Sequence, residues 1–348
     1  MRKSPAEFKK NAISGICWFA GFICLFQVIF WLMTNVWIQD FWDAQYVLKT
    51  ETLEKSMANK PGQPLWLIMG SSTVEDGVRA GLLNTPETPL VFNYGMGGAD
   101  LFRQMICLRR LLEAGIKPQH VGIEVLGALM SIPESGFSHK EDFIVRARKD
   151  ELDIYSQFSV EPGRVRHLWM KSRFNPASVF GVNLPPHTFS WSSFPRFWRA
   201  EKPPYDEWGW LPLQDPGGAV HAQKLVDEKA IYKAQYFDNV KFGVSGFTDR
   251  VLREILDICK KENIDVFIFR MPESPDFQKI YPPEANEAIE SYLSRFVSET
   301  GVPFIDGRSW VEENGFDDGH HLAPDGAEEF TKRMGQELLR WQNGAKQH

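Results

Sequence analysis

The chain has 348 residues, of which 43% are hydrophobic, and it carries a formal net charge of -6. This length permits one large domain, or a domain with an insertion, around a substantial core. The acidic balance argues against nucleic-acid binding, because phosphates require a basic surface. The four cysteines form no CxxC motif and no Cys/His cluster with zinc-ligand spacing, so we expect no metal and no cofactor.

The N-terminus begins with a basic stretch that leads into a long apolar run. Residues 1–10 contain four lysines or arginines and one glutamate, and no charged residue occurs from 12 to 38. About 20 apolar residues cross the hydrocarbon core, and flanking positive charge favours the cytoplasmic side. We therefore predict that residues 1–42 form a cytoplasmic N-terminus and a single transmembrane anchor in the cytoplasmic (inner) membrane. Residues 43–348 would then be periplasmic. The alternative is a buried core helix.

Beyond the anchor, short apolar runs alternate with helical patterns. The expected strands are 64–70, 89–95, 120–127, 264–272 and 302–307, and the expected helices are 100–115, 248–263, 282–301 and 323–341. This alternation predicts an α/β fold, a three-layer α/β/α sandwich around a five-stranded parallel, flavodoxin-like sheet. Ligands of such sheets bind beyond the carboxyl ends of the strands.

Residues 130–243 interrupt this alternation and are rich in proline, tryptophan, phenylalanine and arginine. An interval this long is rarely structureless, so we predict an insertion into the 43–348 domain, with helices of its own around 141–158. Tryptophans beside arginines suit stacking on the sugar rings of a glycan. They are equally suited to the core of the insertion or to a membrane surface.

Three stretches with candidate catalytic residues fall at the carboxyl ends of expected strands. They are Gly70-Ser71-Ser72, the glycine-rich "NYGMGGAD" at 93–100, and "DDGHHLAPDG" at 317–326. A serine on a strand-to-helix turn is an exposed nucleophile, and glycine-rich backbone can donate N–H groups to an oxyanion. A histidine three residues after an aspartate can act as base while the aspartate fixes its tautomer. Each stretch alone is common in ordinary loops; their joint placement at one sheet edge favours acyl transfer.

The histidine block permits two registers. Either Asp318 and His321 or Asp317 and His320 form the acid–base pair.

These motifs resemble a known family. "IMGSS" is similar to the first block of the SGNH (GDSL-like) hydrolase superfamily, "NYGMGG" to its glycine block, and "DDGHHLAPDGAEEF" to its terminal Asp-x-x-His-Leu-x-x-x-Gly block. The resemblance covers about 60–130 and 245–340. It implies Ser72 as nucleophile, His321 as base and Asp318 as its partner, because Leu322 and Gly326 fit the pattern when counted from His321. It also implies oxyanion donors from the backbone of Ser72 and of Gly97 or Gly98.

The sequence departs from the family where many members carry an asparagine after the third strand. Here that region offers Glu124 and Gly127, and Gly-Ser-Ser replaces Gly-Asp-Ser. Both departures resemble the membrane-anchored branch that includes the D-alanine transfer protein of teichoic-acid synthesis and alginate O-acetylation proteins. This resemblance implies an extracytoplasmic serine esterase or O-acyltransferase for an acylated envelope or extracellular polysaccharide. It further implies a multi-spanning O-acyltransferase as partner, and it leaves hydrolysis versus transfer open.

Two further residues at strand ends are candidates for substrate binding. Arg270 either holds a substrate anion or carbonyl, or forms a salt bridge with a neighbour such as Glu273. Glu124 either contacts Arg270 or is a solvated strand-end residue.

Two other functions compete with catalysis. A non-catalytic scaffold of the same fold would bind a glycan or a membrane partner, but it has no need for an intact serine, aspartate and histidine set. A flavodoxin-like phosphate-binding protein would use the glycine turns to hold an anion, which leaves the Asp-His block unexplained.

Overall fold

The computed structural model describes residues 5–32, 42–86, 88–131, 141–174, 205–213, 226–227, 229–234, 236–238 and 242–345. The chain forms two compact units, each described here by itself. The first comprises Met1–Ala44 and Ser135–Glu201, and the second comprises Gln45–Glu134 and Lys202–His348.

The first unit is helical in its described parts. Its elements are α1 (Pro5–Leu32), α6 (Glu141–Arg146), η4 (Lys149–Glu151), α7 (Leu152–Gln157) and α8 (Pro162–Phe174). Within α1, Ile13–Leu32 has a mean hydropathy of 2.1 and none of its most apolar window is buried, so its length and composition suit a membrane span. The helices expected around 141–158 are present.

Trp169 of α8 belongs to the packing of this first unit. Its indole Nε1–H donates to the Ala147 carbonyl at 2.9 Å, and the Arg173 guanidinium lies 5.1 Å from its ring centroid. Two further tryptophans of residues 130–243, Trp191 and Trp198, lie outside the described residues.

The second unit is built on a five-stranded parallel sheet, as the sequence predicts. Its strands are β1 (Leu65–Gly70), β2 (Leu90–Gly95), β3 (His120–Glu124), β4 (Asp265–Arg270) and β5 (Phe304–Asp306), in the order β2-β1-β3-β4-β5. All neighbouring strands are parallel, so their carboxyl ends meet at one edge. The residues that follow β1 and β2 are therefore neighbours.

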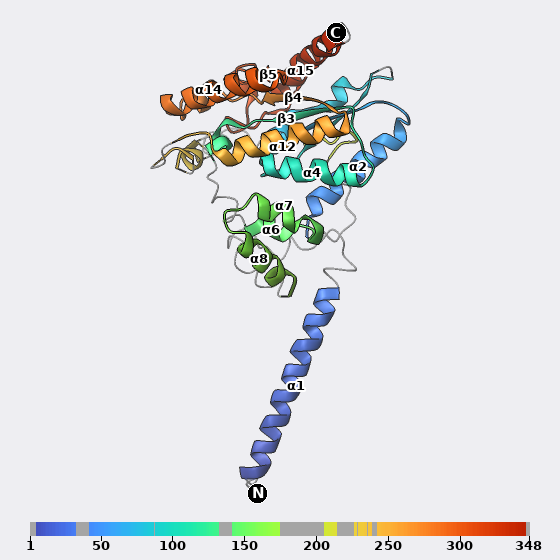
Figure 1. Cartoon of the computed structure of the whole chain (residues 1–348), viewed down its shortest axis with the longest axis vertical. Coiled ribbons are helices and arrows are strands. Elements are labelled where there is room, and N and C mark those ends of the chain that lie inside the picture. The colour runs from blue at the N-terminus through green and yellow to red at the C-terminus, as the bar shows by residue number, and fades with distance from the viewer. Residues whose placement is uncertain are drawn as a thin grey trace. The chain divides into compact units, whose positions relative to one another are not determined.

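Helices cover both faces of this sheet and complete the α/β/α sandwich. They are α2 (Ala44–Asn59), α3 (Ser72–Gly77), α4 (Leu101–Glu113), α12 (Gly246–Glu262), α13 (Pro275–Gln278), α14 (Pro283–Thr300) and α15 (Pro324–Ala345), with single turns η2 (Ala80–Leu83), η3 (Gly127–Ser131) and η5 (Glu313–Gly315). Figure 1 shows α4 and α12 side by side on one face, with α15 on the other. The α14 helix joins α12 through a 3.0 Å hydrogen bond from the Tyr292 hydroxyl to Asp249.

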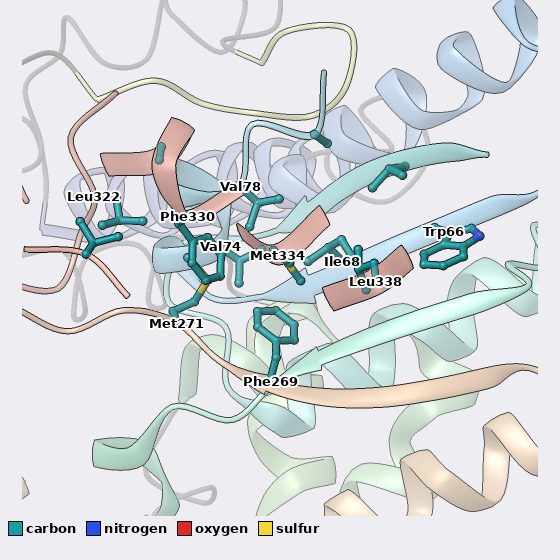
Figure 2. Packing of buried hydrophobic residues seen from close by; sticks show 14 of the residues in the cluster. Trp66, Ile68, Val74, Val78, Phe269, Met271, Leu322, Phe330, Met334 and Leu338 are labelled. Atoms are coloured by element: carbon teal, nitrogen blue, oxygen red, sulfur yellow. The ribbon is translucent and has the colours of Figure 1, made fainter. Parts of the chain in front are cut away.

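A buried hydrophobic cluster fixes α3 against the sheet. Ile68 and Phe269 from the strands meet Val74 of α3 and Phe330 and Met334 of α15 (Figure 2). Each fully buried side chain of this kind contributes about 1.5–3 kcal/mol. The short helix that carries Ser72 is thus held by the core on the face opposite the site.

Trp208 and Trp210 of the predicted insertion also pack against this cluster. Asn93, on β2, donates from Nδ2 to the carbonyls of Val74, Glu75 and Val78. The Leu211 N–H donates to the Glu75 carbonyl. Segment 205–213 is therefore a strap over α3, and these two tryptophans serve packing.

Candidate active site

The apolar run of β1 ends because the chain turns sharply into α3. Ser71 caps the helix by accepting a hydrogen bond from the Thr73 N–H at 3.3 Å. At Gly70 a Cβ atom would lie 2.2 Å from Val74 Cγ2 and 2.7 Å from Glu124 Oε2, so only glycine fits. The turn leaves Ser72 half-buried at the first position of the helix.

Three side chains form a hydrogen-bonded chain at this edge. His321 Nε2 lies 2.7 Å from the Ser72 hydroxyl oxygen, and His321 Nδ1 lies 2.7 Å from Asp318 Oδ2. The other carboxylate oxygen of Asp318 accepts the His321 backbone N–H at 2.8 Å. A carboxylate at Nδ1 favours the tautomer that leaves the Nε2 lone pair facing the serine proton.

The ionisation of Asp318 suits this arrangement. Burial by itself raises the pKa of Asp318, but the hydrogen bond from His321 and the nearby charges of His320 and His321 outweigh it and hold the pKa well below its usual range. The group is therefore a carboxylate throughout the physiological range and can stabilise a protonated His321.

His320, the rival base, lies in a different environment. Its ring is buried and stacks on Phe277 with centroids 5.0 Å apart, and Tyr232 covers it at 4.5 Å. Asp317 is likewise buried, and its backbone N–H donates to the His321 carbonyl at 2.8 Å. Of the two registers, the structure brings Asp318 and His321 to Ser72.

Metal binding at these residues would compete with the hydrogen-bonded chain. One ligand atom each of Asp318, His320 and His321 lies within 4.8 Å of the others, a spacing a cation could use. Its ligands would include the carboxylate and imidazole groups that bond to each other and to Ser72. The arrangement therefore suits a triad or a cation, but not both at once.

The glycine block after β2 lies beside α3. A Cβ atom on Gly95 would be 2.3 Å from the Glu75 backbone nitrogen, and one on Gly97 would be 3.4 Å from the Glu75 carboxylate. Gly98 has φ +72°, a conformation that favours glycine. The turn therefore requires glycine at 95 and favours it at 98, whereas a Cβ on Gly97 would make only an ordinary contact.

Backbone N–H groups of the nucleophile turn and of the glycine block are free in the described part of the chain. Within the described part of the chain, the N–H groups of Ser72, Gly97 and Gly98 have no hydrogen-bond acceptor. Their neighbours differ, since the Met96 N–H donates to the Gly70 carbonyl and the Ala99 N–H to the Met96 carbonyl. Unpaired N–H groups beside a nucleophile can stabilise a developing oxyanion.

Glu124 stabilises the turn that carries Ser72. It is 1% exposed and accepts hydrogen bonds from the Ser71 N–H at 2.6 Å and from the Thr73 hydroxyl. Burial raises its pKa, and these hydrogen bonds partly oppose that shift. The expectation of a solvated Glu124, or of one in contact with Arg270, is wrong because the turn itself supplies its partners.

Arg270 is committed to carboxylates. Its Nε donates to Asp306 at 2.9 Å, its Nη1 to Glu290 at 2.5 Å, and its Nη2 to Asp306 again. Burial lowers the pKa of this guanidinium, but the two carboxylates outweigh burial and raise it. These partners occupy the guanidinium, so the expectation that Arg270 holds a substrate anion or carbonyl is wrong. The partner is not Glu273, which pairs with Arg308 at 2.6 Å.

A second group of buried polar residues adjoins α3 and was not predicted. Lys49 Nζ donates to the Gly209 carbonyl at 2.6 Å, lies 3.9 Å from Glu75 and sits 3.8 Å from the Tyr205 ring centroid. The Tyr205 hydroxyl donates to Glu75 at 2.9 Å. Burial lowers the Lys49 pKa to about 8, against the opposing charges of Glu75 and Asp76.

Asp76 completes this group and is 5% exposed. Burial raises its pKa to about 7; the charge of His321 opposes that shift and the charge of Glu75 adds to it. The spacing of Ser72, Glu75 and Asp76 along a helix could have indicated that they are neighbours. Lys49 and Tyr205 come from segments without any such signal.

One protein-family model matches residues 229–341, about a third of the chain, and no curated protein matches. A crystal structure of a "putative acylhydrolase" from Bacteroides fragilis has 10% identity and a TM-score of 0.38, covering 83% of this chain and 96% of its own. A GDSL-like lipase from Bacteroides thetaiotaomicron has 10% identity and a TM-score of 0.36, covering 85% of this chain and 98% of its own.

Proposed function

We propose that this protein is a membrane-anchored, extracytoplasmic serine esterase or O-acyltransferase of the SGNH type. Its substrate would be an acylated cell-envelope or extracellular polysaccharide. The observation that carries the proposal is the chain of two 2.7 Å contacts that joins Ser72, His321 and Asp318.

The reaction follows from this geometry in two stages. His321 Nε2 takes the hydroxyl proton as Ser72 Oγ attacks the acyl carbonyl carbon, and the oxyanion meets the free N–H groups of Ser72 and Gly97. Collapse of this intermediate breaks the ester bond, and the leaving alkoxide takes the proton from His321. Asp318 stabilises the imidazolium in between.

The acyl group is then bound to Ser72 through a new ester bond. His321 removes a proton from water or from a sugar hydroxyl, and the resulting nucleophile attacks the acyl carbon. Ser72 leaves and recovers its proton from His321. Water as acceptor gives hydrolysis and a sugar hydroxyl gives transfer.

The anchor, its orientation and the partner belong to this proposal. Ile13–Leu32 of α1 would hold the protein in the membrane, and the preceding basic residues favour a cytoplasmic N-terminus. This topology places the second unit on the extracytoplasmic side, where envelope polymers occur. A multi-spanning O-acyltransferase would supply or remove acyl groups in the transfer reaction.

Electrostatics disfavours the phosphate-binding alternative. The turn after β1 is surrounded by the carboxyl groups of Glu75, Asp76, Glu124 and Asp318, all of which are buried. A phosphate dianion would be repelled by these groups. Active-site labelling distinguishes the non-catalytic scaffold from an enzyme.

The test is active-site labelling of the full chain in detergent with a fluorophosphonate probe. Wild type should be labelled, and Ser72→Ala and His321→Ala should each abolish labelling. Ser294→Ala, at an exposed serine on α14, is the matched control and should label like wild type. A folded wild type that neither reacts with the probe nor cleaves an acetyl ester would favour the scaffold.

A further inference from the structure

Asp76 lies one helical turn after Ser72 on α3. Residues four apart share a helix face, so its side chain is on the nucleophile's side of this helix. The backbone of Asp76 is held by the strap 205–213, because the Trp210 indole N–H donates to the Asp76 carbonyl at 2.6 Å. The charge of His321 lowers the pKa of the Asp76 carboxyl group and the charge of Asp318 raises it, so Asp76 lies within electrostatic reach of the triad.

The other buried carboxyl groups around Ser72 all have partners. Asp318 binds His321, Glu75 accepts from Tyr205 and Gln45, and Glu124 accepts from the turn. In contrast, the Asp76 carboxyl group has no hydrogen bond and no ion pair with any residue that the structure describes. Its two oxygens are not fully enclosed, so a donor from outside the protein can reach them.

The charge of Lys49 lowers the pKa of Asp76, but the two side chains form no ion pair. The Lys49 ammonium group is held by the Gly209 carbonyl, lies over the Tyr205 ring and is nearest to Glu75 among the carboxylates. The carboxyl group of Asp76 therefore remains available to a donor that enters with the substrate. Its raised pKa shows that the folded chain tolerates an unfavourable environment for this group, as binding sites often do.

We propose that Asp76 is a substrate-binding residue that accepts a hydrogen bond from a free hydroxyl group on the carbon next to the ester-bearing carbon. This inference rests on the proposed function and specifies its substrate as the monoacylated vicinal diol of a sugar or polyol. A carboxylate that bonds this hydroxyl orients the ester towards Ser72. A substrate with an anionic group next to the ester should bind poorly, because four carboxyl groups surround the site.

Two small esters test the inference with little else changed. They are 2-hydroxyethyl acetate, in which acyl migration regenerates the same molecule, and 2-methoxyethyl acetate, which keeps the ester and the neighbouring oxygen but lacks the donor. The quantity to measure is the ratio of their kcat/KM values. We expect wild type to favour the hydroxyl ester about 10-fold, because a site built to bond a hydroxyl discriminates against analogues without one.

Variants of Asp76 and a control show whether Asp76 causes the preference for the hydroxyl ester. Asp76→Ala should bring the ratio to about 1, mainly through KM for the hydroxyl ester. Asp76→Asn keeps an acceptor oxygen and should retain part of the preference. Asp325→Asn removes an exposed carboxylate and should leave the ratio unchanged. Fluorophosphonate labelling of Ser72 in each variant shows that the site is folded.

Several results would overturn the inference. One is a wild-type ratio near 1, another is an Asp76→Ala variant that keeps the wild-type preference, and a third is a Ser72 that reacts with the probe in a chain that cleaves neither ester. Absence of labelling in folded wild type would instead overturn the proposed function, and this inference with it.

Discussion

The Ser72 hydroxyl and His321 Nε2 are 2.7 Å apart although 249 positions separate the two residues in the chain. Parallel strands explain this distance, since β1 delivers Ser72 and the loop after β5 delivers His321 to one edge. The sheet topology therefore creates the site.

Asp318→Asn tests the orienting carboxylate. An amide in this position no longer stabilises an imidazolium and permits the wrong tautomer of His321, so kcat/KM should fall about 1,000-fold to 10,000-fold. Ester cleavage and thermal unfolding are measured together. An active variant with unchanged kcat/KM would show that Asp318 has no role in the reaction.

Gly70→Ala tests the turn. The added methyl group would lie 2.2 Å from Val74 Cγ2, so unfolding should require about 1–3 kcal/mol less free energy. Chemical denaturation measures this loss in unfolding free energy. A double variant that also carries Val74→Ala lacks Cγ2 and should recover part of the free energy lost to the steric clash. The control is Gly163→Ala, where no atom lies within 4 Å; it should not destabilise the chain.

Asp76→Asn should stabilise the protein in a pH-dependent manner. The folded-state pKa is about 7 and the ordinary value is 3.8, so the folded chain binds the proton more tightly and loses stability as pH rises between these values. The asparagine variant avoids this loss. It should exceed wild type by about 1–4 kcal/mol at pH 8 and by almost nothing near pH 4.

Denaturation of both proteins across this pH range is the measurement. A constant difference between Asp76→Asn and wild type would contradict the raised pKa.

Arg270→Gln separates structure from substrate binding. The change leaves Asp306 and Glu290 without their guanidinium, and both carboxylates are about half exposed, so the loss in unfolding free energy should be near 1 kcal/mol. KM for the two esters should stay within about 2-fold of wild type. A large rise in KM with unchanged stability would return Arg270 to the substrate site.

The sequence was informative where local chemistry and chain order coincide. The alternation of apolar strands and helices predicted the sheet, and Gly70, Ser72 and His321 stood out because tight turns and reactive groups follow strands. Strand ends were less well defined, since β3 ends at Glu124 and not at residue 127. Its backbone there bonds to the Gln104 side chain, a long-range contact without a local signal.

Side-chain partners could not be predicted in the same way. Arg270 was expected at the site or beside Glu273, yet its partners come from β5 and α14. Lys49 meets Tyr205 only because the strap 205–213 folds over α3. Such pairs depend on packing between distant segments, and neither periodicity nor motif spacing encodes them.

The most direct test of the central claim is to trap the acyl-enzyme. The full chain is mixed with 4-nitrophenyl acetate, quenched in acid, digested and examined by mass spectrometry. We predict one acetyl group on the Ser72 hydroxyl, which should be absent from His321→Ala under the same conditions. Acetylation confined to lysines or to other serines, in a folded chain that releases nitrophenolate, would contradict Ser72 as the nucleophile.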